Sequence, residues 1–452
     1  MNLKTINNVY FLGIGGIGMS ALARYFKFLD KNVAGYDKTP TDITKELQES
    51  NIEIHFDDKL ESIPAKFKNK EETLIIYTPA IPKEHLGLNY FRNENFELHK
   101  RAKILGDITR NSFCFAVAGT HGKTTTSSIL AHLLNETGTP ITAFLGGVSE
   151  NFNSNFLIKG NEYTVVEADE FDRSFLQLSP NIACITSMDA DHLDIYGEKK
   201  ELEKSFIEFT KKIKQGGKLF IRNGLPLNGI TYGIEDDSDY CIRNLKIDNA
   251  TYVFDVVTPY GNVEGVMFNK PGQHNLLNAL VAFAMAAQIG TPPGRLAKAL
   301  ETFKGVKRRF SYHIKTDSIV YIDDYAHHPT EINAIHQAVS EMYPTSKTLA
   351  IFQPHLFSRT RDFIDDFAES LSKFDEIILL DIYPAREVAI EGVTSKWLLD
   401  KINNANKVLI AKKDLPKMVK KSKASIIITM GAGDIGEEVV HVKEALLEEI
   451  NV

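Results

Sequence analysis

A glycine-rich run in the first third of the chain has the composition of a phosphate-binding loop. Residues 119–125 read GTHGKTT, between the apolar run Phe113–Ala118 and a helix expected at Thr124–Leu134. Backbone N–H groups in such a loop surround phosphates, Lys123 would reach the terminal ones, and the Thr124 hydroxyl can ligate Mg²⁺. A valine replaces the leading glycine of the common pattern, which makes the loop a compact variant. The residues expected to contact a nucleotide are Gly119, Thr120, His121, Gly122, Lys123, Thr124 and Thr125.

A second glycine-rich run lies near the N-terminus. Residues 13–18 read GIGGIG, between a strand expected at Val9–Ile14 and a helix expected at Ile17–Leu29. Glycines there permit a tight turn and let a pyrophosphate approach the helix N-terminus, and Asp37 stands where an acid can meet a ribose hydroxyl. A structural turn is the alternative, and the motif does not choose between NAD, FAD and another diphosphate carrier. The candidate ligand-binding residues are Gly15, Gly16, Ile17, Gly18 and Asp37.

Two acidic runs follow further expected strands. Residues 165–170 read VVEADE, and one carboxylate such as Glu167 suffices beside Thr124, because Mg²⁺ usually keeps several waters. A solvated acidic turn is the alternative. Residues 189–194 read DADHLD, in which His192 is either an ordinary loop residue, a second metal ligand or a phosphate contact. Spacing alone does not decide between these roles.

Histidines and arginines gather in two loops of the last third. Residues 323–329 read DDYAHHP after a strand expected at Ser318–Ile322, and residues 352–361 read FQPHLFSRTR from the end of the next strand. Ligand groups in α/β folds lie at the carboxyl ends of parallel strands, so three histidines and two arginines would meet at one edge. Such a cluster favours an anionic substrate, although a single histidine is more often structural.

The elements that position these residues alternate between short apolar strands and helical segments, which is typical of βαβ units around parallel sheets. Short β-branched runs over residues 240–269 instead predict an added antiparallel region, and the helix expected at Leu276–Ile289 is apolar on nearly every face. We therefore predict a three-domain α/β protein. The expected domains are residues 1–107, which are Rossmann-like, residues 108–305, which carry the P-loop type site, and residues 306–452, which are again Rossmann-like.

Composition narrows the class of protein. The 452 residues carry a net charge of −7, which gives no basic footprint for nucleic acid. The longest apolar run, Ala279–Ala287, is far shorter than a membrane span, so no membrane insertion is expected. The cysteines are Cys114, Cys184 and Cys241, and their sparse spacing indicates a reducing compartment. Together these features predict a cytoplasmic enzyme.

Two phosphate loops on separate domains leave three functions open. The chain is an enzyme that spends ATP on a nucleotide-bearing substrate, a dehydrogenase with a regulatory NTPase domain, or a nucleotide-switched binding module. A dehydrogenase leaves the acidic runs and the third domain unexplained, and a switch protein does not need the histidine and arginine loops. A ligase uses all three regions.

A series of ordered motifs resembles the Mur ligases. These are GTHGKTT at 119–125, EADE at 167–170, DADHLD at 189–194, GQHNLLN at 272–278, KRRF at 307–310 and DDYAHHPTE at 323–331. Four others resemble the branch of the family that uses L-alanine: FLGIGGIGMS at 11–20, FQPHLFSRTRD at 352–362, DIYP at 381–384 and MGAGDIG at 430–436. The resemblance covers the chain essentially from end to end.

The resemblance implies ATP-dependent ligation of L-alanine to UDP-N-acetylmuramate through an acyl phosphate, in the synthesis of peptidoglycan precursors. The glycine-rich run at residues 13–18 would then hold UDP rather than a redox cofactor. The alternative is the recycling branch, which adds a tripeptide to the same UDP-N-acetylmuramate and shares most ATP-site motifs. We expect a monomer or a weak homodimer that needs Mg²⁺.

Residue roles follow from motif position. Lys123 would bind the β- and γ-phosphates, Thr124 and Glu167 would hold Mg²⁺, and His192 would bind a second Mg²⁺ or a phosphate. On the adenine side the resemblance implies His274, Asn275 and Asn278, with Arg309 and Asp324 at the ATP phosphates and ribose. Around the alanine and the acyl phosphate it implies Tyr325, His328, His355 and Arg359.

The sequence departs from the family pattern at two positions. Ala326 replaces a glycine of many relatives, and Leu356 replaces an arginine, so contacts with the alanine carboxylate are expected to shift to Arg359. Several Mur ligases carry a carbamylated lysine near the second metal. We do not predict this modification here, although Lys204 lies nearby in the sequence.

Overall fold

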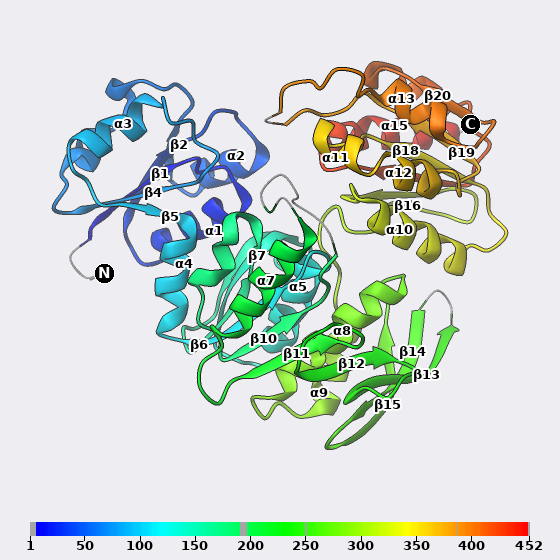
Figure 1. The fold of residues 1–452 in the computed structure, drawn as a ribbon, viewed down its shortest axis with the longest axis horizontal. Helices are drawn as coiled ribbons and strands as arrows, with labels where there is room; N and C mark the ends of the chain where they lie inside the picture. The colour runs from blue at the N-terminus through cyan, green and yellow to red at the C-terminus, as the bar shows by residue number, and fades with distance from the viewer. Residues whose placement is uncertain (1–5, 190–195, 197, 249–250, 386, 451–452) are drawn as a thin grey trace. The chain divides into compact units, whose positions relative to one another are not determined.

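The computed structural model describes residues 6–189, 196, 198–248, 251–385 and 387–450, and Figure 1 traces them from blue to red. Three sheets carry the fold, one in each of the three predicted domains. The chain divides into two compact units. The first consists of Met1–Leu245, Phe254–Met267 and Leu277–Lys304, and the second of Lys246–Val253, Phe268–Leu276 and Gly305–Val452.

The first sheet has five parallel strands in the order β3-β2-β1-β4-β5. The order reverses between β1 and β4, so the loop after β1 opens at the switch point where such sheets bind ligands. Alternate residues of β1 face two different cores, Val9 and Phe11 on one side, Tyr10 and Leu12 on the other. The strands are β1 (Asn8–Leu12), β2 (Asn32–Tyr36), β3 (Glu53–His55), β4 (Thr73–Tyr77) and β5 (Leu98–Lys100), and the helices are α1 (Ile17–Phe28), α2 (Asp42–Glu49), α3 (Leu86–Asn93) and α4 (Arg101–Arg110).

The second sheet has ten strands in the order β15-β14-β13-β12-β11-β10-β6-β9-β7-β8. Strand β6 pairs in parallel with β9 and β10, so the carboxyl ends of these three strands share one edge. The strands are β6 (Phe113–Ala118), β7 (Ile141–Ser149), β8 (Ser154–Ile158), β9 (Tyr163–Glu167), β10 (Ile182–Ile185), β11 (Lys218–Arg222), β12 (Ile230–Ile234), β13 (Tyr240–Asp248), β14 (Thr251–Thr258) and β15 (Gly261–Phe268). The helices are α5 (Lys123–Glu136), α7 (Lys199–Thr210), α8 (Gln273–Ala287) and α9 (Pro293–Glu301).

The third sheet has six strands in the order β16-β17-β21-β18-β19-β20, of which only the β16–β17 pair is antiparallel. The strands are β16 (Ser311–Lys315), β17 (Val320–Asp324), β18 (Thr348–Phe352), β19 (Glu376–Leu379), β20 (Lys407–Leu409) and β21 (Ile426–Met430). The helices are α10 (Pro329–Met342), α11 (Phe357–Asp362), α12 (Ile364–Leu371), α13 (Ser395–Lys401), α14 (Leu415–Val419) and α15 (Val439–Ile450). One face of the sheet packs under α10, α12 and α13, and the other under α14 and α15, which makes a three-layer domain.

The structure confirms the α/β alternation and the buried helix, since residues 279–286 of α8 are at most 1% exposed. Strands β13, β14 and β15 are separated by two residues each, too few for a parallel crossover, which supports the expected antiparallel region. Strand β17 extends two residues further than expected, so Asp323 and Asp324 end the strand rather than begin the loop. No described helix is long and apolar enough to span a bilayer.

The domain boundaries expected at 107/108 and 305/306 stay a prediction. The first falls inside α4, which runs unbroken from Arg101 to Arg110. Within the first compact unit, one hydrophobic core continues from Val9 and Phe11 of the first sheet to Ala116 and Val166 of the second. These two sheets are therefore held together by shared packing.

Candidate active site

The second glycine loop, residues 119–122, joins β6 to α5 as predicted. Gly119 and Gly122 have φ values of +131° and +82°, which side chains rarely adopt. A Cβ atom on Gly119 would lie 2.1 Å from the Thr186 hydroxyl, and one on Gly122 would lie 2.5 Å from Oδ1 of Asn278. Both glycines are thus required by backbone conformation and by close packing.

Residues 186–189, which follow β10, hold this loop in place through hydrogen bonds. The Ser187 hydroxyl accepts the His121 N–H at 2.8 Å and lies 2.8 Å from the Thr120 hydroxyl. The Thr120 hydroxyl in turn accepts the Asp189 N–H at 3.0 Å. Thr186 donates to the carbonyl of His121. The loop is therefore shaped before any nucleotide binds, which lowers the ordering cost of binding.

Lys123 opens α5, and its amino group lies inside the loop. Its Nζ donates to the Gly119 and Thr120 carbonyls at 2.7 and 3.3 Å, and to Oε1 of Glu170 at 2.8 Å. Burial opposes the charge on Lys123, but nearby Glu170 and Glu167 outweigh it and raise the Lys123 pKa. The lysine is therefore a fixed cation at the predicted phosphate site.

Glu170 is fully buried, and burial raises its pKa to about 7 although Lys123 acts in the opposite direction. Sequence reasoning gave this residue no role. The acidic run 167–170 pointed to it, but only the structure separates the partners of its three carboxylates: Glu167 faces the Gly146 N–H, Asp169 faces Arg101, and Glu170 faces Lys123.

Thr124 and Glu167 offer the hard oxygen atoms that Mg²⁺ prefers. Thr124 lies in the first turn of α5, and Glu167 ends β9 opposite Val117 of β6, so both stand at the same sheet edge. Gly146 leaves room for the Glu167 carboxylate, since a Cβ there would lie 2.1 Å from Oε2. Two protein oxygens with waters and phosphates fit a magnesium ion. The described residues form no group of three or more metal-type side chains.

His192, the other predicted metal or phosphate ligand, lies outside the described residues, as does most of the run 189–194. Lys204, considered for carbamylation, has a side chain that is 67% exposed and pairs with Glu201. This exposed ion pair gives no support to a modified lysine at the nucleotide loop.

The first glycine loop, residues 13–16, joins β1 to α1, which is the predicted strand–loop–helix arrangement. The Gly15 N–H donates to Oδ2 of Asp37 at 2.7 Å, so the predicted acid already contacts the loop. Gly16 immediately precedes the first turn of α1, which Ile17 and Gly18 begin. The structure thus brings together all five residues predicted to bind the diphosphate carrier.

The three residues expected on the adenine side divide between the compact units. In the first unit, Asn278 of α8 accepts the Thr126 hydroxyl at 3.1 Å and packs against Gly122 of the phosphate loop. In the second, the Asn275 amide donates to the Pro271 carbonyl at 2.6 Å, and the His274 ring lies beside Gly272. Of the three residues, Asn278 is therefore the one that contacts the phosphate loop at residues 119–122.

In the second unit, two arginines, Arg308 and Arg309, lie close to the Tyr325 ring, each with its guanidinium carbon 5.2 Å from the ring centre. Arg308 is held in place, because its Nε donates to Asp323 at 3.0 Å and its Nη2 to the Gly431 carbonyl at 2.7 Å. Arg309 pairs more loosely with Glu331, at 3.7 Å. The expected contact of Arg309 with a phosphate of ATP stays a prediction.

Asp324 is buried at the end of β17. Its two carboxylate oxygens accept the Phe310 and Ala326 N–H groups at 2.6 and 2.7 Å. Burial raises the pKa of Asp324 to about 7, although the Arg309 charge acts against this. Asp324 therefore ties the loop around Arg309 to the loop that carries Tyr325, whatever contact it makes with ATP.

The two histidine loops meet at the carboxyl edge of the third sheet. The rings of His327 and His355 are 6.0 Å apart, and Nη1 of buried Arg359 lies 3.3 Å from Nδ1 of His355. Tyr383 stacks on His355, with ring centres 5.8 Å apart. The sequence assigned Tyr383 no role, although its motif DIYP resembles the family. His328 instead packs edge-on against Phe363 and caps α10 through Thr330.

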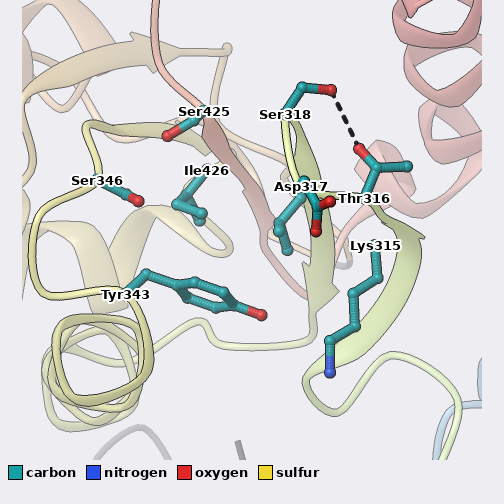
Figure 2. A pocket seen from close by; sticks show the side chains of 9 residues that line it. Lys315, Thr316, Asp317, Ser318, Tyr343, Ser346, Ser425 and Ile426 are labelled. Carbon is teal, nitrogen blue, oxygen red and sulfur yellow. Dashed lines mark hydrogen bonds between the residues drawn. The ribbon is translucent and has the colours of Figure 1, made fainter. Parts of the chain in front are cut away.

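A separate cavity of about 480 Å³ lies in the second unit, and Figure 2 shows the side chains that line it. It lies where β17 and β21 begin, whereas the histidines and arginines lie where the strands of this sheet end. None of the predicted site residues lines it. Its lining residues are Lys315, Thr316, Asp317, Ser318, Val320, Tyr343, Ser346, Ser425 and Ile426.

Family models match three consecutive parts of the chain. The Mur ligase family catalytic domain matches residues 8–113, the Mur ligase middle domain residues 117–286, and the Mur ligase glutamate ligase domain residues 308–433. The three matched ranges follow the order of the three sheets.

Whole proteins match over their full length. The UDP-N-acetylmuramate–L-alanine ligase of Flavobacterium psychrophilum is 62% identical over 99% of this chain and 100% of its own. The crystal structure of the UDP-N-acetylmuramate–alanine ligase of Thermotoga maritima is 27% identical, with a TM-score of 0.81 over 98% of this chain and 99% of its own. A murein peptide ligase of Psychrobacter arcticus shares the fold, with a TM-score of 0.72 at 23% identity over 97% and 98% of the two chains. The chain therefore belongs to the Mur ligase family.

Proposed function

We propose that this chain is an ATP-dependent ligase that joins L-alanine to UDP-N-acetylmuramate. The observation that carries the function is the end-to-end identity of 62% with a UDP-N-acetylmuramate–L-alanine ligase. The braced phosphate loop around Lys123 supports the use of ATP. The overall reaction converts ATP, UDP-N-acetylmuramate and L-alanine into ADP, phosphate and UDP-N-acetylmuramoyl-L-alanine.

A carboxylate is a poor electrophile, so the lactyl carboxylate must first be activated. Its oxygen takes the γ-phosphoryl group of ATP, which releases ADP and leaves an acyl phosphate. The alanine amine then attacks the acyl carbon, the amide bond forms, the nitrogen loses a proton, and inorganic phosphate departs. Positioning and charge neutralisation supply most of the catalysis in such transfers.

On the ATP side, Lys123 would neutralise the β- and γ-phosphates within the loop of residues 119–125. Thr124 and Glu167 would hold Mg²⁺, which would neutralise the negative charge that develops on the phosphates during transfer. We assign His192 to a second Mg²⁺ or a phosphate by motif position alone. Asn278 would stand behind the loop near the nucleotide base, with His274 and Asn275 close to it in sequence.

On the amino-acid side, Arg359 would pair with the alanine carboxylate, because a buried guanidinium binds a carboxylate with two parallel hydrogen bonds. His355, which contacts Tyr383 and Arg359, is the candidate for the proton from the amine, and His328 would line the same region. Arg309, stacked on Tyr325, would meet the phosphates of ATP, and Asp324 would hold its loop in place or reach the ribose.

Phosphate release tests the identity of the amine. The purified chain is incubated with UDP-N-acetylmuramate, Mg·ATP and each amine in turn: L-alanine, glycine, L-serine and the tripeptide of the recycling branch. We expect the highest kcat/KM with L-alanine and weak activity with glycine and L-serine, because one methylene is worth only about 1–3 kcal/mol in a small pocket. A higher kcat/KM with the tripeptide would assign the chain to the recycling branch instead.

We further propose a magnesium requirement, a cytoplasmic location, and a monomer or weak homodimer. The oxygen-rich pair Thr124 and Glu167 supports magnesium. The sparse cysteines, all buried and free, support a reducing compartment. Equilibrium sedimentation at two protein concentrations tests the state of assembly.

A further inference from the structure

A cavity of about 250 Å³ lies in the first compact unit, between the first glycine loop and the two acids at the end of β9 and just after it, Glu167 and Asp169. Residues 16–19 form one wall, and Glu167 and Asp169 stand on another. All residues that line the cavity belong to the described part of the chain, and Arg101 is the cation among them. Its guanidinium lies beside Gly18 of the glycine loop and pairs with Asp169.

Gly18 makes the space that this guanidinium occupies. A Cβ atom on Gly18 would lie 2.6 Å from Nη1 of Arg101 and 3.1 Å from its Cδ. Gly18 belongs to the first turn of α1, where the helix carries partial positive charge. The positive charge of Arg101 and the partial positive charge at the start of α1 repel each other unless an anion lies in contact with both.

Asp169 fixes the position of the guanidinium. Its Oδ2 accepts Nη2 of Arg101 at 3.2 Å, while its Oδ1 accepts the Phe171 N–H at 3.0 Å. The carboxylate is therefore oriented by the backbone and cannot follow the arginine. A guanidinium has five N–H donors, and this contact engages one of its nitrogens.

We propose that Arg101 is a substrate-binding residue that contacts the diphosphate of UDP-N-acetylmuramate, with Asp169 as its positioning residue. The inference rests on the proposed function, and it adds a side chain from α4 to a site otherwise built from backbone N–H groups. The chemistry is that of a nucleoside diphosphate held between a helix N-terminus and a preoriented guanidinium.

Titration calorimetry of the full chain with UDP and with UDP-N-acetylmuramate tests this. Arg101→Met removes the charge, and Arg101→Lys keeps it without the planar fork. The matched control is Lys100→Met, which removes the neighbouring positive charge that pairs with Asp172 at 2.8 Å outside the cavity. We expect Arg101→Met to raise the Kd of both ligands about tenfold or more, Arg101→Lys to raise it less, and Lys100→Met to leave it within about twofold.

A double-mutant cycle tests the geometry. Gly18→Ala places a Cβ against Nη1, so it should weaken UDP binding in the wild type by more than it does in the Arg101→Met background. Asp169→Asn should weaken UDP binding about threefold in the wild type and have no further effect in Arg101→Met. Fully additive effects would contradict a shared anion site, and melting temperatures confirm that each variant is folded.

The outcomes separate this inference from the proposed function. If the wild type binds UDP-N-acetylmuramate and Arg101→Met binds UDP equally well, the diphosphate contact is wrong and the ligase assignment stands. The diphosphate contact is also wrong if only UDP-N-acetylmuramate is weakened, because UDP lacks the lactyl carboxylate. If the wild type binds neither ligand, the proposed function itself fails.

Discussion

The amino group of Lys123 lies 2.8 Å from both carboxylate oxygens of Glu170, and the glutamate side chain is fully buried. Lys123, the lysine proposed to bind phosphate, is thus oriented before a nucleotide arrives, and the nearby carboxylates raise its pKa. An incoming phosphate meets a cation whose position is already fixed by Gly119 and Thr120. This arrangement favours electrostatic stabilisation with little reorganisation.

Replacement of Lys123 should affect ATP binding without affecting the binding of UDP-N-acetylmuramate. Lys123→Met is expected to abolish ligation and ATP binding but to leave the Kd for UDP-N-acetylmuramate within about twofold, because the two loops follow strands of different sheets. Calorimetry with each ligand measures this, with the exposed Lys204→Met as the control. Loss of both ligands in a folded variant would contradict the separation.

The raised pKa of Asp324 predicts a pH effect on the second compact unit. Its pKa rises from 3.8 to about 7 on folding, so the folded state holds a proton that the unfolded chain has lost between these values. The free energy of unfolding therefore falls as pH increases from 4 to 8. Relative to Asp324→Asn, the wild type should lose on the order of 4 kcal/mol over this range.

Trp397, the single tryptophan of the chain, lies on α13 and reports unfolding of this unit. Urea titrations followed by its fluorescence at pH 4 and pH 8 measure the effect in wild type and variant. The control is Asp317→Asn, which changes an exposed carboxylate of the same unit. An equal pH slope in wild type and Asp324→Asn would refute the prediction.

Arg359 should govern the amino-acid substrate. Arg359→Lys keeps the charge but loses the planar fork, so we expect the KM for L-alanine to rise at least about tenfold while the KM for ATP changes less than threefold. Arg361→Lys on the same helix is the control, because Arg361 is half-exposed and pairs with Asp362. If only the KM for ATP changed, Arg359 would be assigned to ATP binding instead of L-alanine binding.

Glu167 should set the magnesium requirement. Chelation of the metal should abolish ligation, and Glu167→Gln should raise the Mg²⁺ concentration for half-maximal rate at least about tenfold, since it removes a charged ligand. Glu162→Gln, at an exposed position before the same strand, should leave it unchanged. An unaltered magnesium dependence in Glu167→Gln would remove this residue from the metal site.

Sequence patterns were sufficient where a local rule decides the structure. The apolar runs that end in GIGGIG and GTHGKTT predicted both strand–loop–helix units, because glycine conformation and strand burial are local properties. They were insufficient for β7 and β8, which were not expected, and for the end of β17, where two aspartates looked like a loop. Asp324 can be buried at the end of the strand because its carboxylate accepts hydrogen bonds from the Phe310 and Ala326 N–H groups.

Partners that are distant in sequence could not be predicted. Glu170 and Lys123 are 47 residues apart and meet because β9 pairs with β6. Asp169 and Arg101 are 68 residues apart and follow strands of two different sheets, so they meet only where the two sheets pack together. Tyr383 reaches His355 through a bridge between two loops. In each case the residue type was visible in the sequence, but its partner depends on which strands, sheets and loops come together in the fold.

The acidic run at residues 167–170 also limits which sequence changes can be tolerated in evolution. Within four consecutive residues, Glu167, Asp169 and Glu170 each serve a different partner in a different direction. Substituting one affects one partner, but inserting or deleting a single residue would turn all three carboxylates away from their partners at once. Natural variation in this stretch should therefore consist of replacements, while length changes are confined to loops away from the site.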